Sequence, residues 1–431
     1  MRFMIGSIVI RLRRLKQNTQ DIYRQAGFAP AALYVLRYVV VKIPLLLHHI
    51  VQRQKYGSLA KKISRQRARE SPLSCPLIAI KVTGGIGDYI VATRFLRDLR
   101  NSCEDFVFDV YASACPNATW VFSSLDGCRG VYVDSLFDSV SEQYDVSLWV
   151  SQFVILYNSR LATGVLQKYP RLLHAITAIK TYQKHIDVHV QNHPKLDNAL
   201  AREAVFSNAS RRDYLHKIAG IPYGGDEIFL PTAPDSLTRL GIEKRPYITI
   251  HNGFDTAFIV AGNRATKCYP HFGEVVALIK KALPDLLVVQ VGATATGEPI
   301  GNVDLDLTGK TKLSDVAAIL KETLLHIDNE SGLVHMARCF GVTSCAVFGP
   351  TPSDYFGYPA NINIDPPVCG NCWWIKSSWM SLCPKGYENP KCLFEQPPEK
   401  IAAAAIEHLK TILAVHGQDS PEQFRAVARG R

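Results

Sequence analysis

Short apolar runs alternate with amphipathic stretches from residue 76 onward, and this alternation limits the possible folds more than any other feature. PLIAIKV (76–82) and FVFDVYAS (106–113) have the length and side chains of buried strands, and Asp88–Asn101 between them has the period of a helix. Strands joined through helices pair in parallel, with helices over both faces of the sheet. The pattern therefore predicts an α/β domain with a doubly wound parallel sheet.

The alternation restarts after a proline-containing connector, LPTAPDS (230–236). Four further strands are expected, at RPYITIHNG (245–253), LLVVQVGA (286–293), LLHIDNESG (324–332) and CAVFGPT (345–351). Two doubly wound domains in series follow, and ligands of such sheets bind at the carboxyl ends of the strands. We expect an extension, two Rossmann-like domains and a tail, at residues 1–75, 76–230, 240–415 and 416–431.

The positive charge of the chain is concentrated in its first 70 residues. They hold 15 of the 49 Lys and Arg side chains against Asp21 and Glu70 only, which leaves 34 basic and 36 acidic side chains for the rest. The apolar stretch of this segment, residues 31–51, is interrupted by two basic residues and a proline, so it is too short to span a membrane.

An apolar helix followed by a basic cluster predicts an interfacial helix on an anionic membrane surface. The alternative is a helical hairpin that packs on the body of the protein and turns a solvated basic face outward. Because the apolar run precedes the basic cluster, the order is not that of a secretory signal. The charge is not accompanied by a nucleic-acid-binding motif, so nucleic acid is not an expected partner.

GGIGD (84–88) follows a predicted strand and opens a predicted helix. Glycine permits backbone angles closed to other residues, and the N–H groups at a helix N-terminus attract anions. The spacings of the dinucleotide motif GxGxxG and of the phosphate loop GxxxxGK[ST] are not met here or at TGKT (308–311). Asp88 is therefore the unusual feature. It can be a helix cap, or a general base that takes a proton from an attacking hydroxyl.

A second motif, CGNCWWIKSSWMSLCPKGYENPKC (369–392), places CxxC before two further cysteines. Four thiolates make a tetrahedral site suited to Zn or Fe, closed and structural because the protein supplies all the ligands: Cys369, Cys372, Cys383 and Cys392. Two disulfides or four idle thiols are the alternatives. The chain has 11 cysteines, and an odd number with seven scattered suits a reducing cytoplasm.

The motifs together resemble those of glycosyltransferase family 9, the heptosyltransferases. GGIGDYIVATRFLRDLR (84–100) is similar to the N-terminal motif of that family, in which a Gly-Asp pair opens the first helix. The resemblance covers about residues 76–415 in the same order. Its other motifs are HNG (251–253), RATKCYP (264–270), VQVGATATGE (289–298) and DNESGLVHMARCFGVTSCAVFGPTPSDYFGY (328–358).

The resemblance implies a GT-B fold, in which two Rossmann-like domains face a cleft. The acceptor would bind the first domain and a nucleotide-activated heptose the second. At matching positions, Asp88 is the implied catalytic base, Lys267 neutralises the donor phosphates and Glu298 holds the nucleoside ribose. The remaining implied donor-binding positions lie in the GGIGD turn, in the DNESG turn and one helical turn after DNESG. They are Gly85, Gly87, Glu330, Ser331, Gly332 and His335.

One position departs from the family, because Glu330 stands where the family has Asp before its Ser/Thr-Gly pair. The implied chemistry places negative charge on the leaving diphosphate, which Lys267 and oriented backbone N–H groups stabilise. Asp88 deprotonates the acceptor hydroxyl as it attacks from the opposite face, which predicts inversion. A catalytic metal is not expected.

The sequence thus indicates an inverting glycosyltransferase that moves a heptose from ADP-heptose or a similar nucleotide sugar. The expected acceptor is a lipid-linked saccharide of the lipopolysaccharide core, met by a peripheral enzyme on the cytoplasmic face of a bacterial inner membrane. Two alternatives stay open. A related branch of the family glycosylates autotransporter proteins and carries a comparable four-cysteine iron motif, which allows a protein acceptor. Glu330 allows a catalytically lapsed protein that binds sugar nucleotides.

Overall fold

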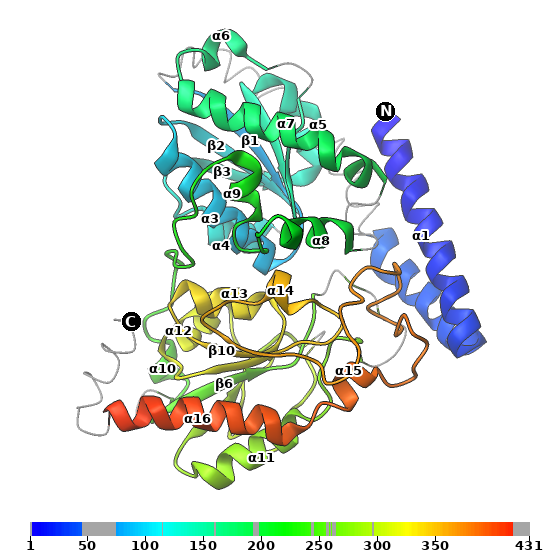
Figure 1. Ribbon diagram of the computed structural model, residues 1–431, viewed down its shortest axis with the longest axis vertical. Helices are drawn as coiled ribbons and strands as arrows, with labels where there is room; N and C mark the ends of the chain where they lie inside the picture. The colour runs from blue at the N-terminus through cyan, green and yellow to red at the C-terminus, as the bar shows by residue number, and fades with distance from the viewer. Residues whose placement is uncertain are drawn as a thin grey trace.

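The protein forms two α/β units that stack along its long axis, with a pair of helices at one side (Figure 1). The computed structural model describes residues 2–44, 75–113, 115–158, 161–192, 198–242, 245–255, 258, 260, 264–294 and 297–416. The expected tail lies almost wholly outside the described residues, as does the basic cluster at 52–69 of the extension.

The first unit has a five-stranded sheet in the order β3-β2-β1-β4-β5, parallel except for the β4–β5 pair. Its strands are β1 (Leu77–Val82), β2 (Val107–Ala112), β3 (Cys128–Val133), β4 (Val146–Val150) and β5 (Val154–Leu156). Its main helices are α3 (Ile86–Ser102), α4 (Cys115–Phe122), α5 (Phe137–Val140), α6 (Thr163–Leu166), α7 (Pro170–Asn192), α8 (Ala199–Phe206) and α9 (Tyr214–Ala219). The sequence pattern of residues 152–225 predicts mainly helices, but the short antiparallel β5 is a strand within that stretch.

The second unit has a six-stranded, fully parallel sheet in the order β11-β10-β9-β6-β7-β8. Its strands are β6 (Tyr247–His251), β7 (Leu287–Gln290), β8 (Leu305–Asp306), β9 (His326–Asn329), β10 (Ser344–Val347) and β11 (Ile362–Ile364). Its helices are α10 (Ser236–Arg239), α11 (Phe272–Ala282), α12 (Leu313–Glu322), α13 (Gly332–Cys339), α14 (Ser353–Phe356), α15 (Lys391–Phe394) and α16 (Pro398–His416).

Each sheet reverses its strand order at one point, between β1 and β4 in the first and between β6 and β9 in the second. Such reversals open the crevice in which doubly wound sheets bind ligands. The helix after β1 is α3 and the helix after β9 is α13, and the two lie against each other where the units meet (Figure 1). One buried apolar cluster runs without a break from the first sheet through α3 to α13 and β10. The fold therefore brings both switch points to one place.

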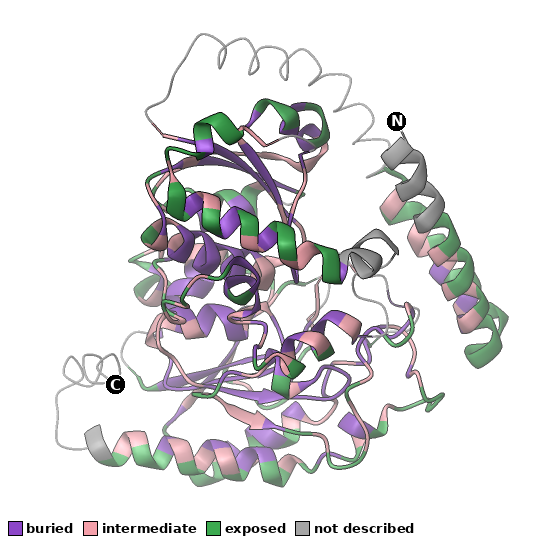
Figure 2. Cartoon of the chain, turned by 45° about the horizontal axis from the view of Figure 1, so that its top comes forward, coloured by how far each residue is buried: buried purple, intermediate pink, exposed green. Residues whose placement is uncertain are grey.

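The N-terminal helix pair consists of α1 (Arg2–Ala26) and a second helix at 28–44. Gly27, at φ +84°, makes the turn between them, and Asn18 donates a hydrogen bond to the Tyr34 hydroxyl at 2.9 Å across the pair. The pair packs on the cysteine-rich segment, where Ser377 donates to Asn18 at 2.5 Å. Much of its outer surface is exposed (Figure 2). Within the described residues, none of the helices combines the length and the apolar content that crossing a bilayer requires.

Candidate active site

In the turn between β1 and α3, the side chain of Asp88 points back toward the glycines that precede it. Asp88 is the third residue of α3, and its Oδ2 accepts a hydrogen bond from the Gly85 N–H at 3.0 Å. Gly84 has φ +130°, and a β-carbon there would collide with the Asp88 carboxylate. One of the two carboxylate oxygens of Asp88 therefore caps the helix, as the first interpretation of Asp88 expects.

The other oxygen of Asp88 is held by Arg211, which the sequence analysis did not single out. The Arg211 Nη2 donates to Oδ1 of Asp88 at 2.7 Å, with 2% of the Arg211 side chain and 23% of the Asp88 side chain exposed. Burial alone would lower the pKa of Arg211, but the Asp88 carboxylate outweighs it and raises that pKa above its ordinary value. Arg211 thus stays charged beside a carboxylate that solvent can still reach.

The second turn, between β9 and α13, is built on a buried carboxylate. The Ser331 hydroxyl accepts from the Leu333 N–H at 3.1 Å and donates to Oδ2 of Asp328 at 2.5 Å. Asp328 is wholly buried, and His251 and His326 contact it at 2.8 and 3.1 Å. Burial would raise the pKa of Asp328, but the two histidines hold it below its usual range. Asp328 fixes the serine that begins α13.

Two charged side chains near this turn are already paired with each other. Lys267 Nζ lies 3.0 Å from Oε2 of Glu330, and both side chains are mostly buried. The acid implied for the ribose, Glu298, pairs instead with Arg264 at 2.8 Å. Lys267 is further fixed through Thr266, whose N–H and hydroxyl donate to main-chain oxygens of the cysteine-rich segment: Met380 at 3.0 Å and Trp379 at 2.5 Å.

His335 packs where the two turns meet. A β-carbon on Gly87 would lie 2.7 Å from Cδ2 of His335 and 3.2 Å from the Gly332 Cα, so this contact requires glycine. The Nδ1 of His335 lies 2.5 Å from the Tyr358 hydroxyl. Burial, followed by two nearby arginines, lowers the pKa of His335 to about 3. His335 is therefore neutral at physiological pH, and its Cδ2–Nε2 edge lies against the Gly87 turn.

Arg94 ties the two units together beside the site. Its guanidinium donates to the Tyr358 hydroxyl at 2.5 Å, to the His335 carbonyl at 3.2 Å and to the Asp226 carbonyl at 2.6 Å, with no exposed surface. The sequence does carry a signal for Arg94, because it stands inside IVATRFL, an otherwise apolar run. Arg211 has no comparable signal, because its partner is 123 residues away.

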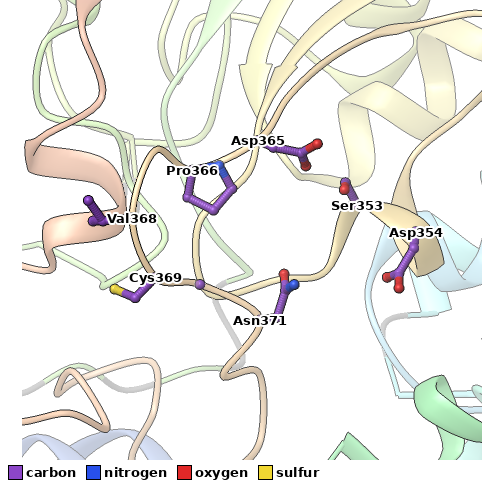
Figure 3. Close-up of a pocket in the computed structure, with 8 residues that line it drawn as sticks. Ser353, Asp354, Asp365, Pro366, Val368, Cys369 and Asn371 are labelled. Atoms are coloured by element: carbon purple, nitrogen blue, oxygen red, sulfur yellow. The ribbon is translucent and has the colours of Figure 1, made fainter.

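The cysteine-rich segment brings its four predicted ligands near one another. Burial, followed by the neighbouring thiols, raises the pKa of Cys392 to about 12 and that of Cys372 to about 11, and Cys369 hydrogen-bonds with Cys392. Cys369 also borders a surface hollow of about 440 Å³ (Figure 3). Across the residues that the structure describes, His, Cys, Asp and Glu form no group of three or more that could hold a metal ion. The four-cysteine site therefore stays a prediction.

Comparisons with known proteins show which proteins the chain resembles. The family model of the heptosyltransferases, glycosyltransferase family 9, matches residues 255–366. The match lies wholly within the second α/β unit, which therefore resembles a family 9 glycosyltransferase domain. The matched region includes Lys267, Glu298 and the β9–α13 turn, and it excludes Asp88. A search among curated proteins finds no match.

Solved structures agree with this fold. The chain is similar to the dodecameric iron-containing heptosyltransferase TibC of enterotoxigenic E. coli in complex with ADP-D-β-D-heptose, at 13% identity, over 78% of this chain and 77% of that one, with a TM-score of 0.51. It is also similar to E. coli ADP-heptose LPS heptosyltransferase II, at 13% identity, over 78% and 98% of the two chains, with a TM-score of 0.47. The similarity to TibC confirms the expected GT-B fold.

Proposed function

We propose that this protein is a family 9 glycosyltransferase, which transfers a heptose from ADP-heptose, with inversion, to a hydroxyl of a lipopolysaccharide-core acceptor. The observation that carries the proposal is the meeting of two helix N-termini of unlike charge at the two switch points. One, on α3, holds the carboxylate of Asp88, and the other, on α13, begins with a neutral serine cap.

The donor diphosphate fits the α13 end of the site. Backbone N–H groups at a helix N-terminus point toward an anion and are favoured by the helix dipole. Lys267 supplies a full positive charge, and a bound diphosphate would compete with Glu330 for it. As the C1–O bond to the diphosphate breaks, the electron pair leaves with the nucleotide, and these groups stabilise the developing charge. Glu298, with Arg264, would contact the nucleoside.

The acceptor hydroxyl fits the α3 end. Its oxygen forms the new bond to C1 while its proton moves to Asp88, which Arg211 and the Gly85 N–H hold in one orientation. A carboxylate whose oxygens are fixed in this way acts on a hydroxyl approaching from the exposed side. Attack from the face opposite the diphosphate inverts the anomeric centre.

The four cysteines fit a soft metal ion by their chemistry. A thiol with a raised pKa gives up its proton when a cation replaces it, and Zn and Fe both accept four thiolates. The ion would supply a structural crosslink, held by Cys369, Cys372, Cys383 and Cys392. The neighbouring TibC is described as iron-containing. Metal analysis of the purified protein, with Cys369→Ser as control, tests this: about one ion per chain, lost in the variant, is expected.

The helix at 28–44 supports attachment to an anionic membrane surface. Its outward side carries an apolar stripe at helical spacing, with Leu36 60% and Val40 62% exposed: Leu33, Leu36, Val40 and Ile43. Such a stripe beside a basic segment binds the lipid headgroup boundary, and binding would concentrate the enzyme near its acceptor. Sedimentation with anionic vesicles should be strong for the full chain and weak for Leu36→Gln/Val40→Gln. Equal sedimentation of both would contradict this attachment.

Calorimetric titration with ADP-heptose, beside UDP-, GDP- and CMP-linked sugars, tests the donor. Saturable binding of ADP-heptose alone, lost in Lys267→Ala, is the expected result. Preference for another sugar nucleotide would keep the reaction class and overturn the heptose. Binding without turnover on any acceptor would favour a lapsed enzyme, and turnover on a protein without lipid would favour an autotransporter-type acceptor.

A further inference from the structure

Arg94, Tyr358 and His335 form a buried chain of hydrogen bonds between the two units. Nη1 of Arg94, on α3, donates to the Tyr358 hydroxyl at 2.5 Å. That hydroxyl lies 2.5 Å from Nδ1 of His335, on α13. The three residues are at most 6% exposed. The proposed reaction gives Arg94 and Tyr358 no role, although their chain of hydrogen bonds ends on a histidine of the site.

The direction of these hydrogen bonds follows from what each group can donate. A guanidinium has donors only, so the Tyr358 oxygen accepts from Arg94 and keeps its single hydrogen. Among the residues that the structure describes, His335 is the other group within hydrogen-bond distance of this hydroxyl. If Nδ1 of His335 carried a proton, the oxygen would accept twice and the tyrosine hydrogen would be buried without an acceptor, which is unfavourable. The Tyr358 hydroxyl therefore donates to Nδ1.

Arg94 is held in this arrangement by its other hydrogen bonds. Its Nη2 donates to the His335 carbonyl at 3.2 Å and to the Sγ of Cys339, one turn further along α13, at 3.5 Å. Its Nε donates to the Asp226 carbonyl at 2.6 Å, in the segment that leads from the first unit to the second. Because these contacts fix the plane of the guanidinium, Nη1 stays directed at the Tyr358 hydroxyl.

A neutral histidine that accepts a hydrogen bond at Nδ1 carries its proton on Nε2. Burial, followed by Arg94 and Arg211, lowers the pKa of His335 to about 3, so the ring does not hold a second proton at physiological pH. Nε2 would lie 3.4 Å from a β-carbon on Gly87. Among the described residues it has no hydrogen-bond partner and it is not fully enclosed, so a ligand can reach it.

The position of His335 on α13 directs this N–H toward the proposed place of the diphosphate. Side chains of a helix lean toward its N-terminus, and His335 is the fourth residue of α13. Its ring lies beside the Gly332 turn and against Gly87 of the facing turn. Because negative charge grows on the diphosphate as its bond to C1 breaks, a fixed hydrogen-bond donor here stabilises the transition state more than the bound substrate.

We propose that Arg94 and Tyr358 are positioning residues that hold His335 with its proton on Nε2, where it donates a hydrogen bond to the leaving diphosphate. The proposal rests on the proposed function, because it places the diphosphate at the N-terminus of α13. It adds a neutral hydrogen-bond donor to the charge of Lys267, and it makes a residue of α3 in the first unit responsible for the orientation of that donor.

Nuclear magnetic resonance of the full chain, with isotope-labelled histidine, tests the position of the proton without any substrate. Long-range proton–nitrogen correlation distinguishes protonated from unprotonated ring nitrogens, and the signal that is absent from His335→Gln assigns the residue. The test variant is Tyr358→Phe. Its matched control is Tyr247→Phe, which removes the hydroxyl of another buried tyrosine, one that donates to the Ile319 carbonyl at 2.8 Å. Melting temperatures of both variants are measured first.

In the unaltered protein and in Tyr247→Phe, His335 should be protonated at Nε2 and unprotonated at Nδ1. In Tyr358→Phe this single form should be lost, because Nδ1 no longer has the hydroxyl that donates to it. A proton on Nδ1 in the unaltered protein, or the same single form in Tyr358→Phe, overturns the proposal. The spectrum of the unaltered protein decides the first of these points even if Tyr358→Phe is unfolded.

Turnover gives a second measurement, which a merely structural role of Tyr358 would not change. In Tyr358→Phe, kcat for transfer from ADP-heptose should fall about tenfold, the value of one hydrogen bond, while KM for the acceptor stays unchanged. Equal kcat in Tyr358→Phe and Tyr247→Phe would overturn the positioning role. If the unaltered protein turns over no acceptor, the proposed function fails by itself. ADP should then still bind Tyr358→Phe more weakly than Tyr247→Phe, and equal binding would overturn the contact with the diphosphate.

Discussion

The two helices that meet at the site, α3 and α13, begin alike and differ in charge. Each follows a central parallel strand and starts with a glycine turn, and Gly87 and Gly332 let them approach within van der Waals distance. In α3 the negative charge of Asp88 lies in the first turn, at the positive end of the helix dipole. In α13 the cap is the neutral Ser331, whose own partner Asp328 is buried beneath it.

In the proposed mechanism, this difference in charge separates the donor and acceptor sites of one GT-B cleft. An anionic diphosphate is repelled by the carboxylate on α3 and attracted by the N–H groups of α13. An acceptor hydroxyl needs a base. The α3 turn presents Asp88, whereas at the α13 turn Asp328 is wholly buried and Glu330 is paired with Lys267. We therefore propose that one residue in the first helical turn, Asp88, determines which substrate each half holds.

The largest expected effect comes from removing the charge on α3. Asp88→Asn keeps an oxygen for Arg211 or for the Gly85 N–H but cannot take a proton, so kcat should fall by about 10²–10⁴. Steady-state transfer from ADP-heptose to an acceptor measures this. Because Arg211 loses its carboxylate, the melting temperature of the variant is measured alongside. A folded variant with unchanged kcat would leave Asp88 as a helix cap only.

A second prediction concerns the far end of α3, where Asp98 accepts from His216 at 2.9 Å and from the Gly224 N–H at 2.8 Å. Burial opposes ionisation, but the hydrogen bonds to His216 and Arg97 lower the pKa of Asp98 to about 2. A lowered carboxyl pKa adds stability that is present above about pH 4 and lost as the pH falls toward 2. Asp98→Asn should cost about 2 kcal/mol at pH 7.

Chemical unfolding at several pH values checks this prediction. The difference in the free energy of unfolding between the unaltered protein and Asp98→Asn should shrink from pH 5 to pH 2. A difference independent of pH would show that the charge of Asp98 does not stabilise α3.

A third prediction concerns Thr266, whose hydrogen bonds hold the segment that carries Lys267 on the α13 side. One of these hydrogen bonds can be removed while Lys267 itself is kept. Thr266→Val removes the hydrogen bond to the Trp379 carbonyl and keeps the one from the Thr266 N–H to Met380. Donor affinity should weaken by about tenfold, the value of one buried hydrogen bond, while Thr266→Ser should restore it. Calorimetry with ADP-heptose measures both. Equal losses in the two variants would point to packing rather than to the hydroxyl.

The smallest expected effect is that of replacing Glu330, and it tests whether Glu330 competes with the donor or binds it. Its carboxylate lies 3.0 Å from Lys267, so it competes with the donor phosphates for that charge. Glu330→Gln should tighten donor binding about threefold, with Glu407→Gln on the exposed side of α16 as control. If Glu330 instead binds the donor directly, as the resemblance implies, the same substitution weakens binding. Whether the donor binds more tightly or more weakly to Glu330→Gln therefore decides between the two roles of Glu330.

The sequence predicts the scaffold well, because both sheets are read from local periodicity. β1, β2, β6, β7 and β9 lie within the expected stretches, β10 begins one residue before its expected stretch, and the glycine turn opens α3 as expected. The short strands β5, β8 and β11 were not predicted, because two or three residues carry too little pattern. The GT-B fold is confirmed, and the family 9 model matches residues 255–366 of the second unit. Roles for individual site residues stay predictions.

The partners of those residues could not be predicted, because they depend on tertiary contacts. Arg211 reaches Asp88 only when the segment after α8 folds back over α3. Sequence comparison directed attention to Glu330 as the acid beside Ser331, whereas the structure pairs Glu330 with Lys267 and places Asp328 under the serine. Side chains separated by two residues along a turn point in different directions, which spacing alone does not reveal.

Donor affinity in the absence of the α3 charge tests the division of roles most directly. ADP-heptose is titrated into Asp88→Asn and into the unaltered protein, with Lys267→Ala as the opposite case. The account predicts equal donor affinity for Asp88→Asn and the unaltered protein, with affinity lost in Lys267→Ala. Loss of donor binding in a folded Asp88→Asn, with Lys267→Ala unaffected, would contradict it and place the donor on α3.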